Sequence, residues 1–376
     1  MATIDTGFAK EIKKYGAKDF DACFNCGNCT AVCGLTEKNA NFPRMLIRYG
    51  MLGQKEEILK SKELWLCYAC GECSLNCPRQ AAPGDYMAAL RRYSIASYEP
   101  TGLTKLIFKS NVFSILITLF LSVLLGFFLL TIKADEVVAR WIFNIFPYAV
   151  IHNIGIIIFS LTGLSMVWGM ITMFRKMYVK TGKKNSSFLS SISKVFSELG
   201  TMKRYRTCDS EEESHWKAKS EIVKPWFVHW AIMWGFIGLL VATSLDFILK
   251  DPATSIWWPS RILGTAAGLL MIYGTSFAMY YRIKKITRSY AETRLADWML
   301  LSFLWIAGFT GFWLEVSVGF AANNILNQIV FMLHTIVSME LVLLFAFSKF
   351  AHAIYRPLAL FFHFHGAEVV VIKQKK

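Results

Sequence analysis

Two stretches decide how the first hundred residues fold: Cys23-Phe24-Asn25-Cys26-Gly27-Asn28-Cys29-Thr30-Ala31-Val32-Cys33 and Cys67-Tyr68-Ala69-Cys70-Gly71-Glu72-Cys73-Ser74-Leu75-Asn76-Cys77-Pro78. In both runs, two, two and three residues separate successive cysteines. The runs contain eight of the nine cysteines, and we interpret the ninth, Cys208, as a plain thiol. Residues 1–16 are polar, which predicts no cleavable signal peptide. We therefore expect the cysteines in the cytoplasm, where metal binding is favoured over disulfides.

This spacing is the ligand run of bacterial two-cluster ferredoxins, in which the fourth cysteine of one run ligates the other cluster. It predicts two [4Fe–4S] clusters with crossed ligation. The first would be held by Cys23, Cys26, Cys29 and Cys77, and the second by Cys67, Cys70, Cys73 and Cys33. Zinc is the alternative metal for these cysteines. Four-coordinate zinc sites are often built from two C-x₂-C pairs, however, and zinc would leave the third cysteine of each run unexplained.

The linker between the runs, residues 42–64, has apolar residues near helical spacing. A compact β-type two-cluster ferredoxin has a shorter linker, so we expect an α-helical ferredoxin domain over residues 1–100. About residues 15–97 resemble the C subunit of heterodisulfide reductase. The resemblance is carried by Pro43-Arg44-Met45-Leu46-Ile47-Arg48, Leu64-Trp65-Leu66-Cys67-Tyr68-Ala69-Cys70-Gly71-Glu72-Cys73, Cys77-Pro78-Arg79 and Leu90-Arg91.

The composition indicates a multi-span membrane protein with basic loops. The 376 residues are 55% hydrophobic, with a mean hydropathy of +0.40 and a formal net charge of +15. Nucleic acid is the other partner that a basic chain suggests, and we expect none because the basic residues flank apolar spans. Six segments are long and apolar enough to cross a bilayer: residues 111–132, 149–174, 226–245, 262–281, 298–314 and 325–348.

We therefore predict an all-α protein with three parts. The ferredoxin domain (1–100) is followed by a six-helix membrane domain (105–357) and a cytoplasmic tail (358–376). The loop 175–224 carries twelve Lys or Arg and the loop 282–297 carries five, whereas the loops on the other side carry two, two and none. The positive-inside rule then places the basic loops and both termini in the cytoplasm. Within the long basic loop, residues 187–199 are predicted to form an amphipathic helix.

Four histidines lie in or at the ends of the predicted spans: His152, His229, His334 and His352. A lone intramembrane histidine is commonly a packing residue or a proton relay. However, His334 and His352 are 18 residues apart, which corresponds to five turns, or about 27 Å along one helix face. Two ligands at two depths suit two stacked hemes. Sorting by depth predicts His152 with His334 for a distal heme, and His229 with His352 for a proximal heme.

The hemes would be b-type, because the chain has no C-x-x-C-His attachment run. Residues 140–355 resemble the cytochrome b (gamma) subunit of respiratory nitrate reductase. That family has both partner histidines on the counterpart of the third span, where this chain offers His229 and then Leu239, so His152 would substitute. The fusion of both modules resembles the C subunit of the quinone-interacting membrane-bound oxidoreductases of sulfate-reducing bacteria.

That resemblance implies a subunit of the bacterial inner membrane that takes electrons from menaquinol. They would pass through the hemes and clusters to flavin- and iron–sulfur-containing subunits, with adenylylsulfate reductase as the eventual acceptor. Two alternatives stay open. One is a heterodisulfide-reductase-type or other quinone-linked module with a different acceptor, or one that reduces quinone. The other is an iron–sulfur head on a heme-free membrane anchor or transporter.

Quinol oxidation needs a proton acceptor near the distal heme. Glu315, near the outer end of the fifth span, is our candidate for the catalytic proton acceptor, with Lys250 or Arg261 as polar partners in the quinone site. The alternative is that these residues are interfacial anchors or partners of heme propionates. Glu340 is a further candidate, because an ionisable side chain inside a span is energetically costly and is therefore first considered as a functional residue.

Overall fold

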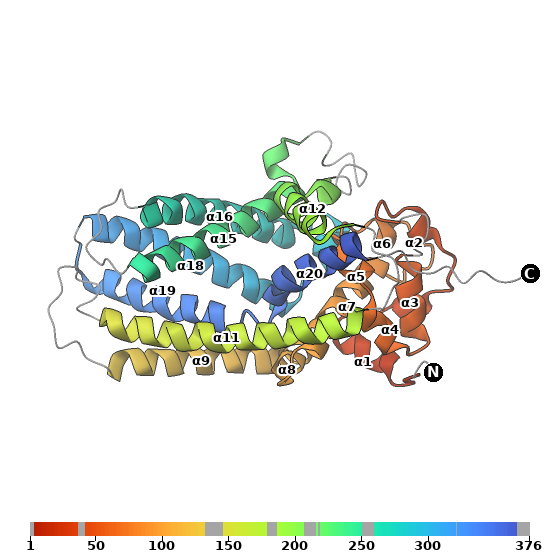
Figure 1. The fold of residues 1–376 in the computed structure, drawn as a ribbon, viewed down its shortest axis with the longest axis horizontal. Coiled ribbons are helices and arrows are strands. Elements are labelled where there is room, and N and C mark those ends of the chain that lie inside the picture. Colours follow the sequence, from red (N-terminus) through yellow and green to blue (C-terminus); the bar gives the residue numbers. More distant parts are fainter. Residues whose placement is uncertain are drawn as a thin grey trace, which may run out of the picture.

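The computed structural model describes residues 4–36, 42–131, 146–178, 186–206, 216, 219–249, 259–320 and 322–366. Over these ranges the chain forms helices and no strand, which confirms the predicted all-α class. Figure 1 shows a group of short helices from the first hundred residues at one end of a bundle of long helices.

The short helices, which we call the head, pack around an apolar core. Its α-helices are α1 (Phe8–Lys14), α2 (Asn28–Ala31), α3 (Arg44–Met51), α4 (Lys55–Lys60), α5 (Glu63–Leu66), α6 (Glu72–Leu75) and α7 (Pro83–Tyr98). Helix α7 buries Met87 and Leu90 completely, and its Tyr86 hydroxyl donates to the carbonyl of Leu46 on α3 (3.1 Å). Its first residue is Pro83, which suits a first turn because that N–H would have no helical partner.

The bundle contains six helices long and apolar enough to cross a membrane, as predicted. Five lie in α9 (Asn111–Thr131), α11 (Tyr148–Met177), α15 (Pro225–Leu249), α16 (Pro259–Lys284) and α18 (Leu295–Gly319), and the sixth is α19 (Ile325–Leu343). A short helix, α8 (Leu103–Lys109), connects the head to α9. Helix α11 extends past its apolar segment to the head, where Lys176 pairs with Glu56 of α4 (2.8 Å).

The sixth span differs from the prediction of one continuous helix that carries both His334 and His352. Helix α19 ends at Leu343, and His352 begins a separate helix, α20 (His352–His365). Between them a 3₁₀ turn (Lys349–Ala351) is capped by Ser348, whose hydroxyl accepts from the N–H of Phe350 (3.3 Å). The break allows Phe350 to stack on Phe345 inside the bundle (5.3 Å). The prediction that both histidines share one straight helix face is therefore wrong.

Helix α20 lies between the head and the bundle, and α12 (Phe188–Thr201) packs along it (Figure 1). Helix α12 begins after Ser187, whose hydroxyl accepts from the N–H of Ser190 (3.3 Å), in agreement with the predicted helix in this loop. Val195 of α12 packs with Leu66 of the head and Leu360 of α20. The described part of the predicted tail, residues 358–366, is thus largely helical and packed against both parts of the molecule.

Candidate functional site

The two cysteine runs adopt the same backbone conformation. In each run the third residue has a positive φ (Asn25, +64°; Ala69, +59°), and so does the fifth (Gly27, +90°; Gly71, +98°). The third residue directs its N–H at the sulfur of the first cysteine, with N···Sγ distances of 3.4 Å at Cys23 and 3.3 Å at Cys67. A one-turn helix follows each run's loop. Such N–H···S contacts stabilise and tune cluster-bound thiolates.

The one-turn helices α2 and α6 contact each other, which brings the two runs together. The side-chain amide of Asn28 donates to the carbonyl of Asn76, and a backbone N–H from Ala81 approaches the sulfur of Cys77 (3.4 Å). All eight cysteines of the runs are free thiols, and Cys208 lies outside the described residues. Over the described ranges, no three Cys, His, Asp or Glu side chains form a group that could hold a single metal ion.

The neighbours of Cys29, Cys33 and Cys73 indicate which thiols lie close together. Burial raises the pKa of Cys29, and the nearby thiols of Cys23, Cys26 and Cys77 contribute to the rise, which brings the pKa to about 11. Cys77 comes from the opposite run. Cys23, Cys26, Cys29 and Cys77 therefore lie near one another, and these are the four cysteines predicted to hold the first cluster.

The second group is formed in the same crossed way. Burial raises the pKa of Cys33, and the thiols of Cys67 and Cys70 add to the rise. Burial likewise raises the pKa of Cys73 well above its ordinary value, and the thiols of Cys67, Cys70 and Cys33 add to the rise, with a smaller contribution from Cys29 of the first group. Each run therefore contributes its fourth cysteine to the surroundings of the other.

At the junction of the head and the bundle, the structure brings His229 of α15 next to His352 of α20. Their ring centroids are 6.3 Å apart and the ring planes are inclined by 37°. An imidazole bound to a first-row metal has a metal–nitrogen bond of about 2 Å, so two imidazoles on one metal have centroids about 6 Å apart. The separation is compatible with both imidazoles binding one metal ion.

The protonation of His352 also suits a ligand. Its Nδ1 lies 2.5 Å from the carbonyl oxygen of Lys349, which can only accept, so Nδ1 must carry the proton. This leaves the lone pair of Nε2 for a metal, which is the arrangement that metal-binding histidines commonly show.

An unbroken series of ring contacts joins this histidine pair to the second cysteine run. Tyr68, between Cys67 and Cys70, stacks on Tyr205 (4.8 Å, 12°), and Tyr205 contacts His229 (6.0 Å). Arg356 of α20 lies over the Tyr68 ring (3.7 Å). Tyr205 could not be found from the sequence, because a residue in a polar loop carries no signal of its spatial neighbours.

The other predicted pair, His152 and His334, has no such series of ring contacts with the head among the described residues. Both helices that carry it, α11 and α19, pack together in the half of the bundle remote from the head. However, Nδ1 of His334 lies 2.9 Å from the hydroxyl of Thr310 on α18, and Gly311 is close to the same ring. Among the described side chains no ring contact links His334 to His152, whose ring contacts Tyr148 (5.7 Å).

The tautomer of His334 resembles that of His352. The Thr310 hydroxyl donates its proton to the carbonyl of Ile306 (2.6 Å), so it accepts from Nδ1–H of His334. Nε2 is then the nitrogen with the free lone pair, and the residue can serve as a metal ligand.

Two of the predicted quinone-site residues form an ion pair. Glu315 of α18 lies 3.5 Å from Arg261 of α16, and both side chains are largely buried. Glu315 is four residues, about one helical turn, beyond Gly311, which touches the His334 ring. The third predicted residue, Lys250, lies outside the described residues.

A buried ion-pair group connects the head to the bundle near the proximal histidines. Asp297 of α18 accepts from Lys349 and lies 3.6 Å from Arg92 of α7. Arg92 and Asp297 are 7% and 5% exposed, so these two side chains are shielded from water, whereas Lys349 is partly exposed. Asp297 carries only a weak signal in the sequence, because it stands at the end of a basic loop, where a solvated acid is common.

The head matches a known cofactor domain. Residues 19–81 match the 4Fe–4S dicluster domain, so the chain carries an iron–sulfur electron-transfer domain. The same region is similar to the C subunit of H(2):CoB-CoM heterodisulfide,ferredoxin reductase from Methanothermobacter thermautotrophicus, with 34% identity over 88 residues (23% of this chain, 48% of the relative).

Two further relatives cover the same part of the chain. A protein of Archaeoglobus profundus, described as like the C subunit of heterodisulfide reductase, is 35% identical over 109 residues (27% of this chain, 58% of the relative). The iron-sulfur C subunit of CoB–CoM heterodisulfide reductase from Methanopyrus kandleri is 37% identical over 70 residues (19% and 36%). The chain thus spans about half the length of the curated relatives it matches. No solved structure matches significantly.

The membrane region has a separate match. Residues 105–368, well over half of the chain, match the family CitB, described as citrate utilization protein B. This match covers all six long helices and α20, and therefore all four span histidines. With an N-terminal dicluster domain and this membrane region, the chain belongs to the citrate utilization protein B family.

Proposed function

We propose that this chain is the membrane subunit of a quinol-linked oxidoreductase, which passes electrons from menaquinol to an iron–sulfur head. The observation that carries the proposal is the contact series His352–His229–Tyr205–Tyr68, which links two paired histidines of the membrane region to the cysteines of the head. When bound, the hemes and clusters supply one-electron carriers, and the chain supplies their positions and environments.

Cys23, Cys26, Cys29 and Cys77 would hold the first cluster, and Cys67, Cys70, Cys73 and Cys33 the second. The crossed gathering of the thiols supports this assignment. His229 and His352 would hold the proximal b-type heme, and the 6.3 Å ring separation supports this. We propose His334 as a ligand of the distal heme, with His152 as its partner from α11.

Menaquinol would bind on the side remote from the head. Glu315 would accept the proton released on quinol oxidation, and Arg261 would hold the carboxylate in place. Glu315 lies one helical turn beyond Gly311, and Gly311 is next to the His334 ring. This spacing supports a quinol site close to His334. Lys250 stays a second candidate for the polar lining.

The membrane is proposed to be the bacterial inner membrane, with the head in the cytoplasm. The domain limits 1–100, 105–357 and 358–376 are proposed accordingly. Electrons would leave for flavin- and iron–sulfur-containing subunits of the same complex, with adenylylsulfate reductase as eventual acceptor. A second candidate has the same parts and serves a heterodisulfide-reductase-type circuit or reduces quinone. The similarity of the head to the C subunits of heterodisulfide reductases favours this alternative.

Cofactor quantification tests the proposal. The purified chain should contain about two hemes and about eight non-heme irons. A chain with the irons and without heme would refute the proposal and support an iron–sulfur head on a heme-free anchor. Identifying the subunits that co-purify with the chain separates the two circuits, because each predicts a different set of partners.

A further inference from the structure

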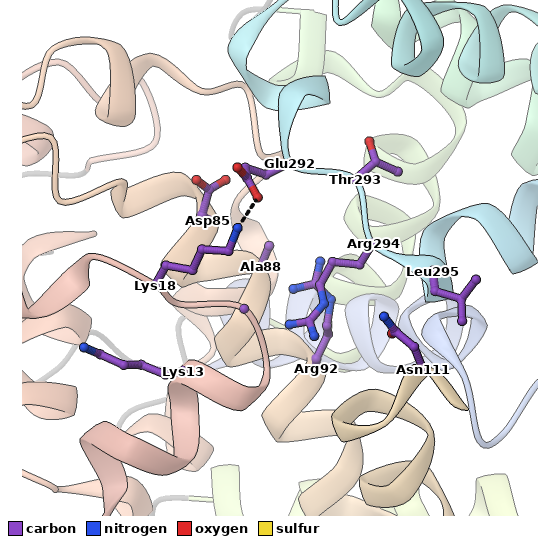
Figure 2. A pocket seen from close by; sticks show the side chains of 11 residues that line it. Lys13, Lys18, Asp85, Ala88, Arg92, Asn111, Glu292, Thr293, Arg294 and Leu295 are labelled. Carbon is purple, nitrogen blue, oxygen red and sulfur yellow. Dashed lines mark hydrogen bonds and ion pairs between the residues drawn. The ribbon is translucent and has the colours of Figure 1, made fainter. Parts of the chain in front are cut away.

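A polar cavity of about 290 Å³ lies where the head meets the bundle. Figure 2 shows it between α1, α7 and the segment that leads into α18. Its lining includes four cations, Lys13, Lys18, Arg92 and Arg294, and two carboxylates, Asp85 and Glu292. The cavity contains none of the proposed cofactor ligands, so it is separate from the electron-transfer site.

Two guanidinium groups converge in this cavity. Gly16, whose φ is +112°, has no side chain there, and a Cβ on it would lie 2.6 Å from Arg294 Nη1 and 3.1 Å from Arg92 Nη1. Figure 2 shows both guanidinium groups side by side. Burial lowers the pKa of Arg294, and the adjacent charge of Arg92 lowers it further. Two like charges this close destabilise each other unless an anion lies between them or beside them.

The carboxylates nearby offset this repulsion only in part, because Asp297 and Glu292 raise the pKa of Arg294 but its pKa still lies below the ordinary value. Glu292 pairs with Lys18 (3.1 Å), and Arg92 is shared with Asp297 (3.6 Å) and with the carbonyl of Tyr15 (2.8 Å). Arg294 donates to the carbonyl of Lys14 (3.3 Å), and among the described residues no carboxylate forms a salt bridge with its guanidinium. Within the lining the four cations outnumber the two carboxylates, although Lys13 also pairs with Asp21 outside it (2.7 Å).

The position of the cavity indicates where an anion would come from. Its lining includes Asn111, the first residue of α9, and Leu295, the first residue of α18. Both helices are candidate membrane spans, so we expect the cavity at their first residues to lie near the level of the phospholipid headgroups. The N-terminal ends of both helices add partial positive charge. Basic pockets between spans on this side of a membrane bind anionic lipid headgroups.

We propose that this cavity binds the phosphoryl group of an anionic phospholipid, with Arg294 and Arg92 as its main donors. Planar guanidinium groups match the paired oxygens of a phosphoryl group. The cavity is large enough for a phosphoglycerol headgroup, while the acyl chains would extend along the apolar surfaces of α9 and α18. The bound lipid would tie the head to the membrane surface beside the buried ion pair of Arg92 and Asp297.

The test is a lipid titration of the cofactor-loaded full chain in a neutral detergent, followed by native mass spectrometry. The probes are phosphatidylglycerol, phosphatidylcholine and inorganic phosphate. The unmodified chain should bind phosphatidylglycerol about tenfold more tightly than phosphatidylcholine. Arg294→Gln should weaken phosphatidylglycerol binding about five- to tenfold, and Lys18→Gln, at an exposed position, about two- to fivefold.

Arg206→Gln is the matched control, because it removes a positive charge next to Trp226 at the start of another span, α15. It should leave the binding of phosphatidylglycerol within twofold. Heme and iron contents report whether each variant folds, and Lys18→Gln alone decides the outcome if Arg294→Gln loses its cofactors. Equal losses in the control and the cavity variants, or no loss in any variant, would overturn the proposal. Binding of inorganic phosphate without binding of phosphatidylglycerol would also overturn it.

Discussion

His229 and His352 lie with their ring centroids 6.3 Å apart, although one lies near the start of a candidate membrane span and the other begins a separate, shorter helix. The helix break after Leu343 makes this possible, because it frees α20 to turn its first residue toward α15. The pair is also the end of the ring series that starts at Tyr68 in the second cysteine run. The ring series from Tyr68 to His352 therefore connects the head with the bundle of long helices.

We expect His229→Ala and His352→Ala to remove the same heme, because each would lose one of two axial ligands. About half of the b-type α band should disappear in either variant. His334→Ala should remove the other heme. His363→Ala is the control: this histidine lies eleven residues further along α20, where it is bonded to Arg204 (2.8 Å), and its loss should leave the spectrum intact. If His229→Ala and His334→Ala removed the same heme, the proposed pairs would be wrong.

Crossed cluster ligation can be read from paramagnetic resonance. Cys77→Ser should alter the same cluster signal as Cys26→Ser, since both thiols gather around Cys29. Cys33→Ser should alter the signal that Cys70→Ser alters. Assignments by run, with Cys77→Ser matching Cys70→Ser, would contradict the crossed arrangement.

Tyr205→Ala is expected to slow electron transfer between the membrane histidines and the head severalfold, because it removes the ring between Tyr68 and His229. Heme and iron contents should stay unchanged. Stopped-flow absorption measures the rate at which the clusters are reduced after the hemes. Tyr178→Ala, at an exposed position stacked on Phe174, is the control with the same side-chain truncation. Equal rates in both variants would exclude a role for the Tyr68–Tyr205 stack.

Replacing Asp297 by Ala should destabilise the junction of the head and the bundle. The change leaves Arg92 and Lys349 without their shared carboxylate, and breaking a buried ion pair costs about 3–5 kcal/mol. Thermal unfolding, followed by loss of heme absorbance, should shift to lower temperature. Glu292→Ala, which breaks an exposed pair with Lys18, should cost about 0–1 kcal/mol. Similar shifts for both variants would show that the buried group has no special structural role.

Glu315→Gln should lower the rate of quinol oxidation by about 10²–10⁴-fold, the usual contribution of a general base, while both hemes are retained. Steady-state oxidation of a menaquinol analogue measures this rate. Glu340→Gln on the neighbouring helix, where the carboxylate accepts from Ser122 (2.7 Å), tests the other candidate acid. Glu11→Gln, which breaks a pair with Lys109 at the head (2.8 Å), is the control. A Glu315→Gln variant with normal activity would leave the ion pair with Arg261 as a structural feature only.

The sequence predicted the helical class, the six long apolar helices and the amphipathic helix that begins after Ser187. These features depend on local periodicity and composition, which a single sequence contains. The pairing of His229 with His352 was also predicted, but from a continuous helix that the structure does not have. The pair forms because Ser348 caps a turn and α20 starts anew at His352.

The parts that could not be predicted depend on contacts between distant segments. Tyr205 approaches Tyr68 only because α12, which precedes Tyr205 in the chain, packs along α20 next to the head. Arg92 and Asp297 lie on helices whose relative placement no local pattern specifies. The surroundings of His334 are similar: its contacts with Thr310 and Gly311 place the ring against α18, a neighbour that sorting by membrane depth cannot reveal.

A single spectrum tests the central claim most directly. The purified full chain is mixed anaerobically with a menaquinol analogue, and its absorption is compared with that of the oxidised protein. We expect a b-type α band that forms first, followed by bleaching of the iron–sulfur absorption in the head. If the chain with intact clusters shows no b-type α band under full reduction, the membrane histidines hold no heme and the proposed function is wrong.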